Sequence, residues 1–131
     1  MKSESYSNAS AILLLDDEFD IITAFTLALE DKGFHVIGFT DPLVALNHFQ
    51  MNSEQYRLVI SDIRMPIMNG YEFIKKVKER KPQVKVFIIS AFEINDIEFR
   101  RELPHVKVDE IIQKPILLED FAGVVSKHMY N

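Results

Sequence analysis

The sequence predicts an α/β fold in which a parallel sheet is covered by helices on both faces. Short apolar runs alternate five times with apolar residues at helical spacing, and most of these runs end in polar side chains. Because parallel strands need long and usually helical crossovers, this alternation favours a doubly wound sheet. The 131 residues are enough for one domain with a real core and too few for two.

The first two strand–helix pairs occupy the start of the chain. Residues 11–15 form an apolar run that predicts a strand, and a helix follows that is expected to end at Gly33. A second strand is predicted over residues 35–39. Asp41 and Pro42 then open a second helix, because a capping carboxylate and an early proline both favour a helix start. The residues expected to line this helix are Leu43, Leu46 and Phe49.

The centre of the chain is the stretch LVISDIRMPIMNG, residues 58–70. It begins with consecutive apolar residues that suit a strand buried on both faces, and this strand stops at Asp62. A loop containing Pro66 follows, and Asn69 is expected to cap the third helix together with Glu72. Asp62 therefore stands at the carboxyl end of a strand, where ligands bind in open α/β sheets.

The last third repeats the pattern with shorter elements. A strand is predicted over residues 84–89 and ends at Ser90, and a weaker helix covers residues 94–103. A short fifth strand over residues 108–112 ends just before Lys114. The final amphipathic helix is indicated by Leu118, Phe121, Ala122, Val125 and Met129.

Polar side chains end four of the strands: Asp16 with Asp17, then Asp62, Ser90 and Lys114. Because the carboxyl ends of parallel strands share one edge, these groups are expected to meet as a cluster. Three close carboxylates repel unless a cation is present, and an oxygen-only ligand set suits Mg²⁺. A carboxylate can also be the nucleophile in phosphoryl transfer, with a lysine and a hydroxyl stabilising the transferred group.

Composition excludes several classes of protein. A formal charge of −5 and a pI of about 5.3 argue against direct binding to nucleic acid. The absence of cysteine excludes disulfides and is compatible with a cytoplasmic location. No apolar run reaches the roughly 20 residues that span a bilayer, so no membrane insertion is expected. One basic cluster is interpreted as the solvated face of the third helix: Lys75, Lys76, Lys78, Arg80 and Lys81.

The ordered set of motifs resembles the receiver domain of two-component response regulators, of the single-domain, CheY-like kind. The motifs are Asp16-Asp17, Asp62 with Met65-Pro66 and Asn69-Gly70 behind it, Ser90-Ala91 and Lys114-Pro115. The likeness covers about residues 11–129. It implies a flavodoxin-like (βα)5 fold with strand order 2-1-3-4-5, in which residues 1–10 are a flexible tail and residues 11–131 are the receiver domain.

The resemblance also implies the roles of the site residues. Asp62 would accept a phosphoryl group from a histidine kinase or a phosphotransfer protein. Asp17, Asp62 and the backbone carbonyl of Arg64 would hold Mg²⁺, and Asp16 would act through a metal-bound water. Lys114 would contact the phosphoryl oxygens.

Ser90 would share that contact with the phosphoryl group and act as a switch residue. Its partner in the switch is Ile111, which stands where the family has an aromatic residue. The Lys114–Pro115 peptide bond is expected to be cis, which is accessible because it precedes proline.

The sequence thus predicts a phosphorylation-dependent switch that catalyses only its own phosphorylation and dephosphorylation. Because the chain ends just after the last helix, a stand-alone receiver is expected. It would signal to a downstream protein through a face near the fourth helix, fifth strand and last helix, as a monomer or a phosphorylation-dependent dimer.

Three alternatives stay open at this point. A Mg²⁺-dependent phosphohydrolase with an aspartyl nucleophile would need a substrate cap, for which the chain has no room. A flavin-binding carrier would need a phosphate-binding loop after the first strand, where acids stand instead. A receiver-like module that binds its partners without phosphorylation is opposed only by the presence of all the parts of a phosphorylation site.

Overall fold

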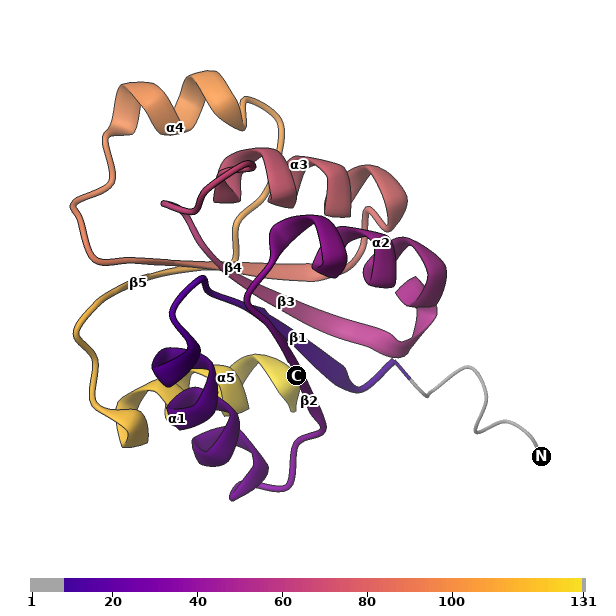
Figure 1. The fold of residues 1–131 in the computed structure, drawn as a ribbon, viewed down its shortest axis with the longest axis vertical. Helices are drawn as coiled ribbons and strands as arrows, with labels where there is room; N and C mark the ends of the chain where they lie inside the picture. The colour runs from indigo at the N-terminus through magenta and orange to yellow at the C-terminus, as the bar shows by residue number, and fades with distance from the viewer. Residues whose placement is uncertain (1–8, 131) are drawn as a thin grey trace.

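The computed structural model describes residues 9–130, so most of the tail predicted over residues 1–10 lies outside the described residues. The described chain forms one parallel sheet in the order β2-β1-β3-β4-β5, which confirms the predicted topology (Figure 1). The strands are β1 (Ala11–Leu15), β2 (Val36–Phe39), β3 (Tyr56–Asp62), β4 (Lys85–Ser90) and β5 (Glu110–Gln113). The helices are α1 (Phe19–Glu30), α2 (Pro42–Asn52), the 3₁₀ turn η2 (Ser53–Gln55), α3 (Gly70–Arg80), α4 (Asp96–Glu102) and α5 (Leu118–Met129).

Helices cover both faces of the sheet. Helices α1 and α5 pack on one face, and α2 and α3 on the other, with α4 beside α3 (Figure 1). Because successive strand residues point to opposite faces, Leu13 of β1 enters the core under α2 and α3, and Leu14 enters the core under α1 and α5. In the second core the rings of Phe25 and Phe121 stack with centroids 4.1 Å apart. Burial on both faces explains why the central strands are unbroken apolar runs.

Two helix starts follow the predicted capping chemistry. Asp41 Oδ1 accepts a hydrogen bond from the Leu43 amide at 2.8 Å, with Pro42 as the first residue of α2. Asn69 Oδ1 accepts one from the Glu72 amide at 2.9 Å. Leu43 itself, expected to line α2, is exposed, because residues further along the helix fill its buried side.

Helix α4 differs most from its sequence-based expectation. It is shorter than the predicted 94–103, and it has no buried residue. Asn95 caps it by accepting a hydrogen bond from the Glu98 amide at 2.9 Å. Ile97 is exposed, whereas Ile94 packs partly against the core. Ile97 therefore leaves apolar surface exposed near the predicted partner-binding face, whereas Ile94 does not.

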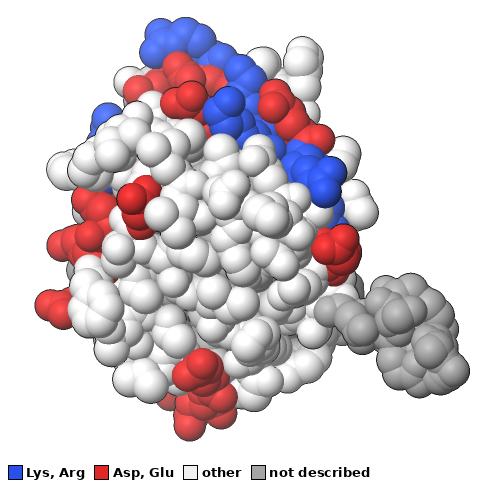
Figure 2. Space-filling view, turned by 45° about the vertical axis from the view of Figure 1, so that its right-hand side comes forward, with Lys and Arg blue, Asp and Glu red and all other residues white. Residues whose placement is uncertain are grey.

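Charged side chains are unevenly distributed over the surface. Helix α2 contains none of them, and Figure 2 shows a broad uncharged area with Lys and Arg gathered along one side of it. None of the helices described here is long and apolar enough to cross a membrane.

Candidate functional site

Parallel pairing brings two acids together at the carboxyl edge of the sheet. Leu15 pairs with Ser61, so the residues that follow them, Asp16 and Asp62, stand side by side. Asp16, Asp17 and Asp62 each place a carboxylate oxygen within 4.8 Å of the other two. Asp16 and Asp62 are buried and Asp17 is exposed. The three carboxylates predicted to meet do lie together, and one of them faces solvent.

Lys114 reaches this cluster from the end of β5. Its Nζ lies 2.8 Å from Asp16 Oδ2, 3.9 Å from Asp62 Oδ2 and 3.7 Å from Glu18 Oε1. The Lys114–Pro115 bond is cis, as expected. Burial alone would lower the pKa of Lys114, but its hydrogen bond to Asp16 and the surrounding acids raise it above the ordinary value. Lys114 is therefore a fixed positive charge beside the acids.

The electrostatics of Asp62 depend on its burial. Loss of hydration is the largest cause that raises the pKa of Asp62 from 3.8 to about 6, and the negative charge of Asp16 is the second. Lys114 and the hydrogen bond from the Ile63 amide, 2.9 Å from Asp62 Oδ1, oppose the rise without cancelling it. The cluster thus holds more negative charge than one ammonium group balances. An all-oxygen set of this charge fits a hard cation such as Mg²⁺.

Ser90 ends β4 as predicted, but its hydroxyl is engaged within its own turn. Ser90 Oγ donates to the Phe92 carbonyl at 2.7 Å and accepts from the Phe92 amide at 3.1 Å. The Lys114 amide donates to the Ser90 carbonyl at 2.7 Å. Among the described residues, no hydrogen bond joins the Ser90 hydroxyl to Asp62. Ser90 and Asp62 therefore end neighbouring strands, but the Ser90 side chain is bonded to its own turn and not to Asp62.

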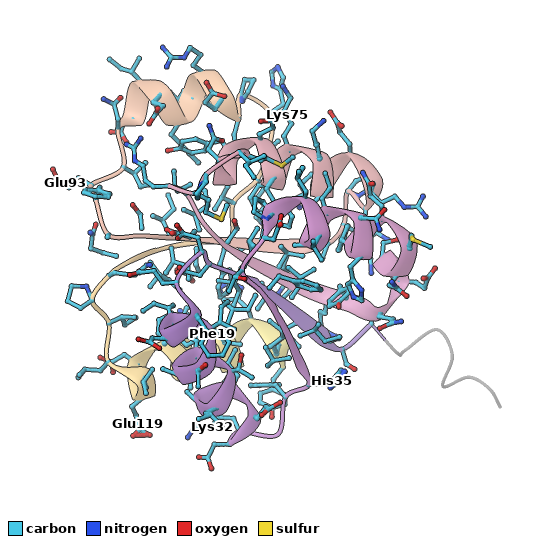
Figure 3. The ribbon with its side chains drawn as sticks, in the orientation of Figure 1. Phe19, Lys32, His35, Lys75, Glu93 and Glu119 are labelled. Carbon is cyan, nitrogen blue, oxygen red and sulfur yellow. The ribbon has the colours of Figure 1, made fainter. Side chains whose placement is uncertain are left out.

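The Arg64 side chain and Ile111 lie outside the carboxylate cluster. The Arg64 guanidinium is turned toward α4, 4.0 Å from Glu98 Oε1 and 5.8 Å from the ring centroid of Phe92. Ile111 lies on β5 and is 47% exposed. In Figure 3, Glu93 marks the connection from β4 to α4, which also contains Phe92.

Gly70 has a role that the sequence indicated only as a loop signal. Its amide donates to the Ile63 carbonyl at 2.8 Å, and a Cβ at this position would collide with the Asp62 carbonyl oxygen. The backbone after β3 can therefore fold back over Asp62 only if residue 70 is glycine. The Asn69-Gly70 pair was the available signal.

Ile67 is a second feature that sequence reasoning missed. It has a positive φ of 75°, and the Met68 amide donates to the Pro66 carbonyl at 2.8 Å, closing a three-residue turn. A β-branched residue in this conformation is strained. No sequence signal could have found it, because the local preference of isoleucine opposes the observed geometry.

Comparison with known proteins gives a consistent assignment. The family model for the response regulator receiver domain matches residues 12–126. The response regulator receiver protein CpdR of Brucella abortus is 29% identical over 116 residues, which cover 88% of this chain and 93% of CpdR. The sensor kinase CckA of the same organism is 25% identical over 126 residues, 96% of this chain but 13% of the kinase.

Solved structures agree on the fold. A CheY-like response regulator receiver domain protein from Methanospirillum hungatei superposes with a TM-score of 0.82 at 22% identity, covering 92% of this chain and 94% of that one. At this identity the likeness concerns the fold alone.

Proposed function

The chain belongs to the response regulator receiver domain family, and from this premise we propose that it is a phosphorylation-dependent signalling switch with Asp62 as the phosphoacceptor. One observation carries the proposal: the buried Asp62 carboxylate lies 3.9 Å from the Lys114 ammonium and within 4.8 Å of two further carboxylates. A carboxylate in that setting has a metal site and a fixed positive charge beside it. Receivers are generally signalling modules, and we propose no further substrate turnover.

We propose that Mg²⁺ binds Asp17, Asp62 and the backbone carbonyl of Arg64, with Asp16 acting through a water. When bound, the ion would neutralise negative charge on the cluster and on the incoming phosphoryl group. The pKa of Asp62 is raised first by its burial and then by the negative charge of Asp16, and a bound cation would stabilise the ionised form of this carboxylate. Asp17 suits an ion that keeps waters, because it is the exposed member of the three.

The two oxygens of Asp62 have different surroundings, which suggests the attacking atom. Oδ1 accepts the hydrogen bond of the Ile63 amide, whereas Oδ2 faces Lys114. We propose that Oδ2 attacks the phosphorus of a phosphohistidine on a histidine kinase or phosphotransfer protein. An O–P bond forms, the P–N bond breaks, and the electron pair leaves with the imidazole nitrogen. Lys114 would stabilise the charge on the phosphoryl oxygens.

The switch would involve Ser90. Its hydroxyl must leave Phe92 before it can donate to a phosphoryl oxygen, because its present hydrogen bonds are confined to that residue. Such a move would displace the connection to α4. Exposed Ile97 and half-exposed Ile111 support a protein-binding face made by α4, β5 and α5. Phosphorylation changes the populations of two conformations of this face only to the extent that the phosphoryl group stabilises one conformation more than the other.

The test is the intact mass of the chain after incubation with acetyl phosphate and Mg²⁺. We expect one phosphoryl adduct that requires Mg²⁺ and is absent in Asp62→Asn. Arg64→Ala is the matched control: it keeps the backbone carbonyl and should still be phosphorylated. If no adduct forms even with a panel of histidine kinases, the chain is a constitutive binding module. Steady release of phosphate from small phosphate esters would instead indicate a phosphohydrolase.

A further inference from the structure

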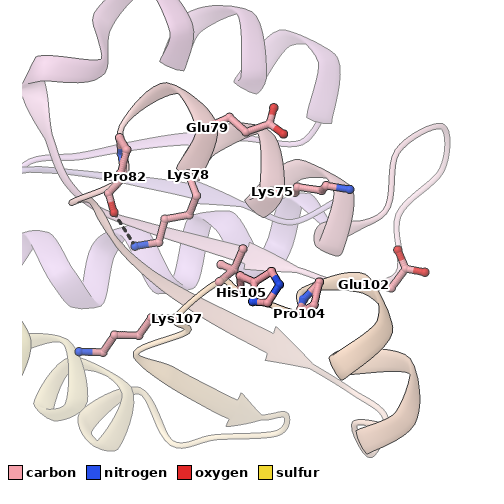
Figure 4. Close-up of a pocket in the computed structure, with 9 residues that line it drawn as sticks. Lys75, Lys78, Glu79, Pro82, Glu102, Pro104, His105 and Lys107 are labelled. Carbon is pink, nitrogen blue, oxygen red and sulfur yellow. Dashed lines mark hydrogen bonds between the residues drawn. The ribbon is translucent and has the colours of Figure 1, made fainter.

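A second concave site lies away from the acidic cluster. This pocket, of about 460 Å³, is formed by α3, the turn before β4 and the segment that joins α4 to β5 (Figure 4). Both connecting segments precede strands, so the pocket is at the amino edge of the sheet, opposite the acidic cluster. Its volume falls in the usual range of ligand pockets. The proposed phosphoacceptor function leaves it unused.

Apolar groups form much of the lining of the pocket. Pro82 comes from the turn before β4, and Pro104 and Val106 come from the segment after α4. Val106 also packs partly against the core, which fixes its position. Rigid prolines and an anchored valine give a preformed apolar surface that can receive a bulky side chain without much loss of entropy.

Three lysines line this apolar surface together with two acids, Glu79 and Glu102, so the lysines are in the majority. Lys78 Nζ donates to the carbonyls of Pro82 and Val84 at 3.1 and 2.6 Å, so its charge is held in place by neutral groups (Figure 4). Among the described residues, Lys75 forms no salt bridge. Lys107 has one contact, 3.7 Å to Asp109, at an exposed position, where an ion pair contributes little.

The basic cluster of α3 is therefore more than a solvated helix face. Residues 75–81 contain five lysines or arginines and one acid, in a chain whose formal charge is −5. The cationic side chains continue past the pocket along α3, where Arg80 Nε donates to the Gln50 carbonyl and Lys81 Nζ to that of Tyr56. Such a row is longer than a small molecule and complements an extended acidic chain.

We propose that this pocket binds an acidic peptide segment of a partner protein. One bulky apolar side chain of the segment would rest on Pro82, Pro104 and Val106, and its flanking carboxylates would pair with Lys75 and Lys107. The proposal goes beyond the phosphoacceptor function and does not depend on it, because the two sites occupy opposite edges of the sheet.

The experiment measures binding of a fluorescein-labelled synthetic peptide to the full chain by fluorescence anisotropy. The peptide carries one central phenylalanine among aspartates and glutamates. We expect saturable binding that weakens with salt, and a loss of affinity of about tenfold in Lys75→Glu/Lys107→Glu. Lys32→Glu is the matched control, since Lys32 is an exposed lysine on the far side of the molecule (Figure 3), and it should bind as the parent does.

Three results would overturn the proposal. The first is equal affinity of the parent and the double variant, after thermal melts confirm that both are folded. The second is equal affinity for a peptide in which glycine replaces the phenylalanine, since that would leave only unspecific charge attraction. The third is stronger, lysine-dependent binding to anionic phosphatidylserine vesicles, which would assign the cationic surface to a membrane.

Discussion

The two edges of the sheet hold their charges in opposite ways. At the carboxyl edge, Asp16 and Asp62 are buried side by side and share Lys114. At the amino edge, Lys78 and Lys81 donate to backbone carbonyls of neighbouring segments. Ammonium groups that donate to carbonyls satisfy these acceptors, so they stabilise the fold. Neighbouring carboxylates repel, so the charges at the carboxyl edge lower the stability of the folded protein but provide a site for a cation.

The largest effect is expected from Gly70→Ala, which disturbs the carboxyl edge through its backbone rather than its charge. The added Cβ would collide with the Asp62 carbonyl oxygen, and we expect a loss of about 3 kcal/mol of unfolding free energy. Urea denaturation measures it. Gly123→Ala is the control, because a Cβ there meets nothing within 4 Å and should stabilise α5 slightly. Equal effects at the two glycines would refute the steric argument.

Asp62→Asn tests whether the carboxyl edge is destabilised by its charge. With a pKa of about 6 against 3.8, folded Asp62 keeps a proton that the unfolded chain has already lost. The unfolding free energy of the Mg²⁺-free protein therefore falls as pH rises between these values. At pH 7 the variant should be more stable than the parent by about 2 kcal/mol.

The same variant should lose the response to metal. Mg²⁺ should raise the melting temperature of the parent more than that of Asp62→Asn, because the ion stabilises the state that binds it. Chemical denaturation at pH 4 and pH 7, with and without Mg²⁺, measures both effects. A variant less stable than the parent at pH 7 without metal would show that the carboxylate is not a source of repulsion.

Lys81→Met tests the amino edge, where the expected sign is reversed. Lys81 Nζ donates to the carbonyls of Ser53 and Tyr56 at 3.0 and 2.6 Å. Methionine keeps the apolar stem and leaves these acceptors without the ammonium group, which should lower stability by about 1.5 kcal/mol. Lys75→Met, which removes an exposed lysine, should change little. A neutral result for Lys81→Met would mean that water replaces the lysine without loss.

The smallest expected effect concerns strain at the carboxyl edge. Ile67 has a φ of 75° and is 78% exposed, so glycine would relieve strain and remove little packing. Ile67→Gly should stabilise the protein by about 1 kcal/mol. Ile67→Ala keeps most of the strain and should stabilise it less. Identical melting curves for the two variants would show that relief of backbone strain at residue 67 does not cause the stabilisation.

The sequence was sufficient for the fold and for the membership of the acidic cluster. Strand runs such as residues 11–15 are apolar on both faces, and parallel topology then brings Asp16, Asp62 and Lys114 to one edge. It was insufficient for side-chain direction. The Ser90 hydroxyl donates to the Phe92 carbonyl, and the Arg64 side chain extends toward Glu98. The partner of such a flexible polar side chain depends on tertiary geometry, which the periodicity of a sequence does not encode.

Local preference also misled or was silent at particular positions. Leu43 is apolar but stands in the first turn of α2, outside the core. Ile67 adopts a backbone conformation that its own side chain disfavours. In the sequence, the lysines in and just after α3 resemble a solvated helix face. In the structure, Lys78 donates to the Val84 carbonyl beyond the next turn, and Lys81 donates to the Tyr56 carbonyl, 25 residues away in the sequence. For the two lysines, a tertiary hydrogen bond outweighs the local tendency.

The hydrogen bond from the Lys114 amide to the Ser90 carbonyl, 2.7 Å long, has a practical consequence for sensor engineering. It joins the ends of two strands, so we expect a displacement of the Ser90 backbone to move the segment that leads into α5. Leu117, the exposed residue just before that helix, is then a suitable attachment point for an environment-sensitive dye. Because the chain has no cysteine, Leu117→Cys would give a single labelling site and an optical readout of the proposed switch.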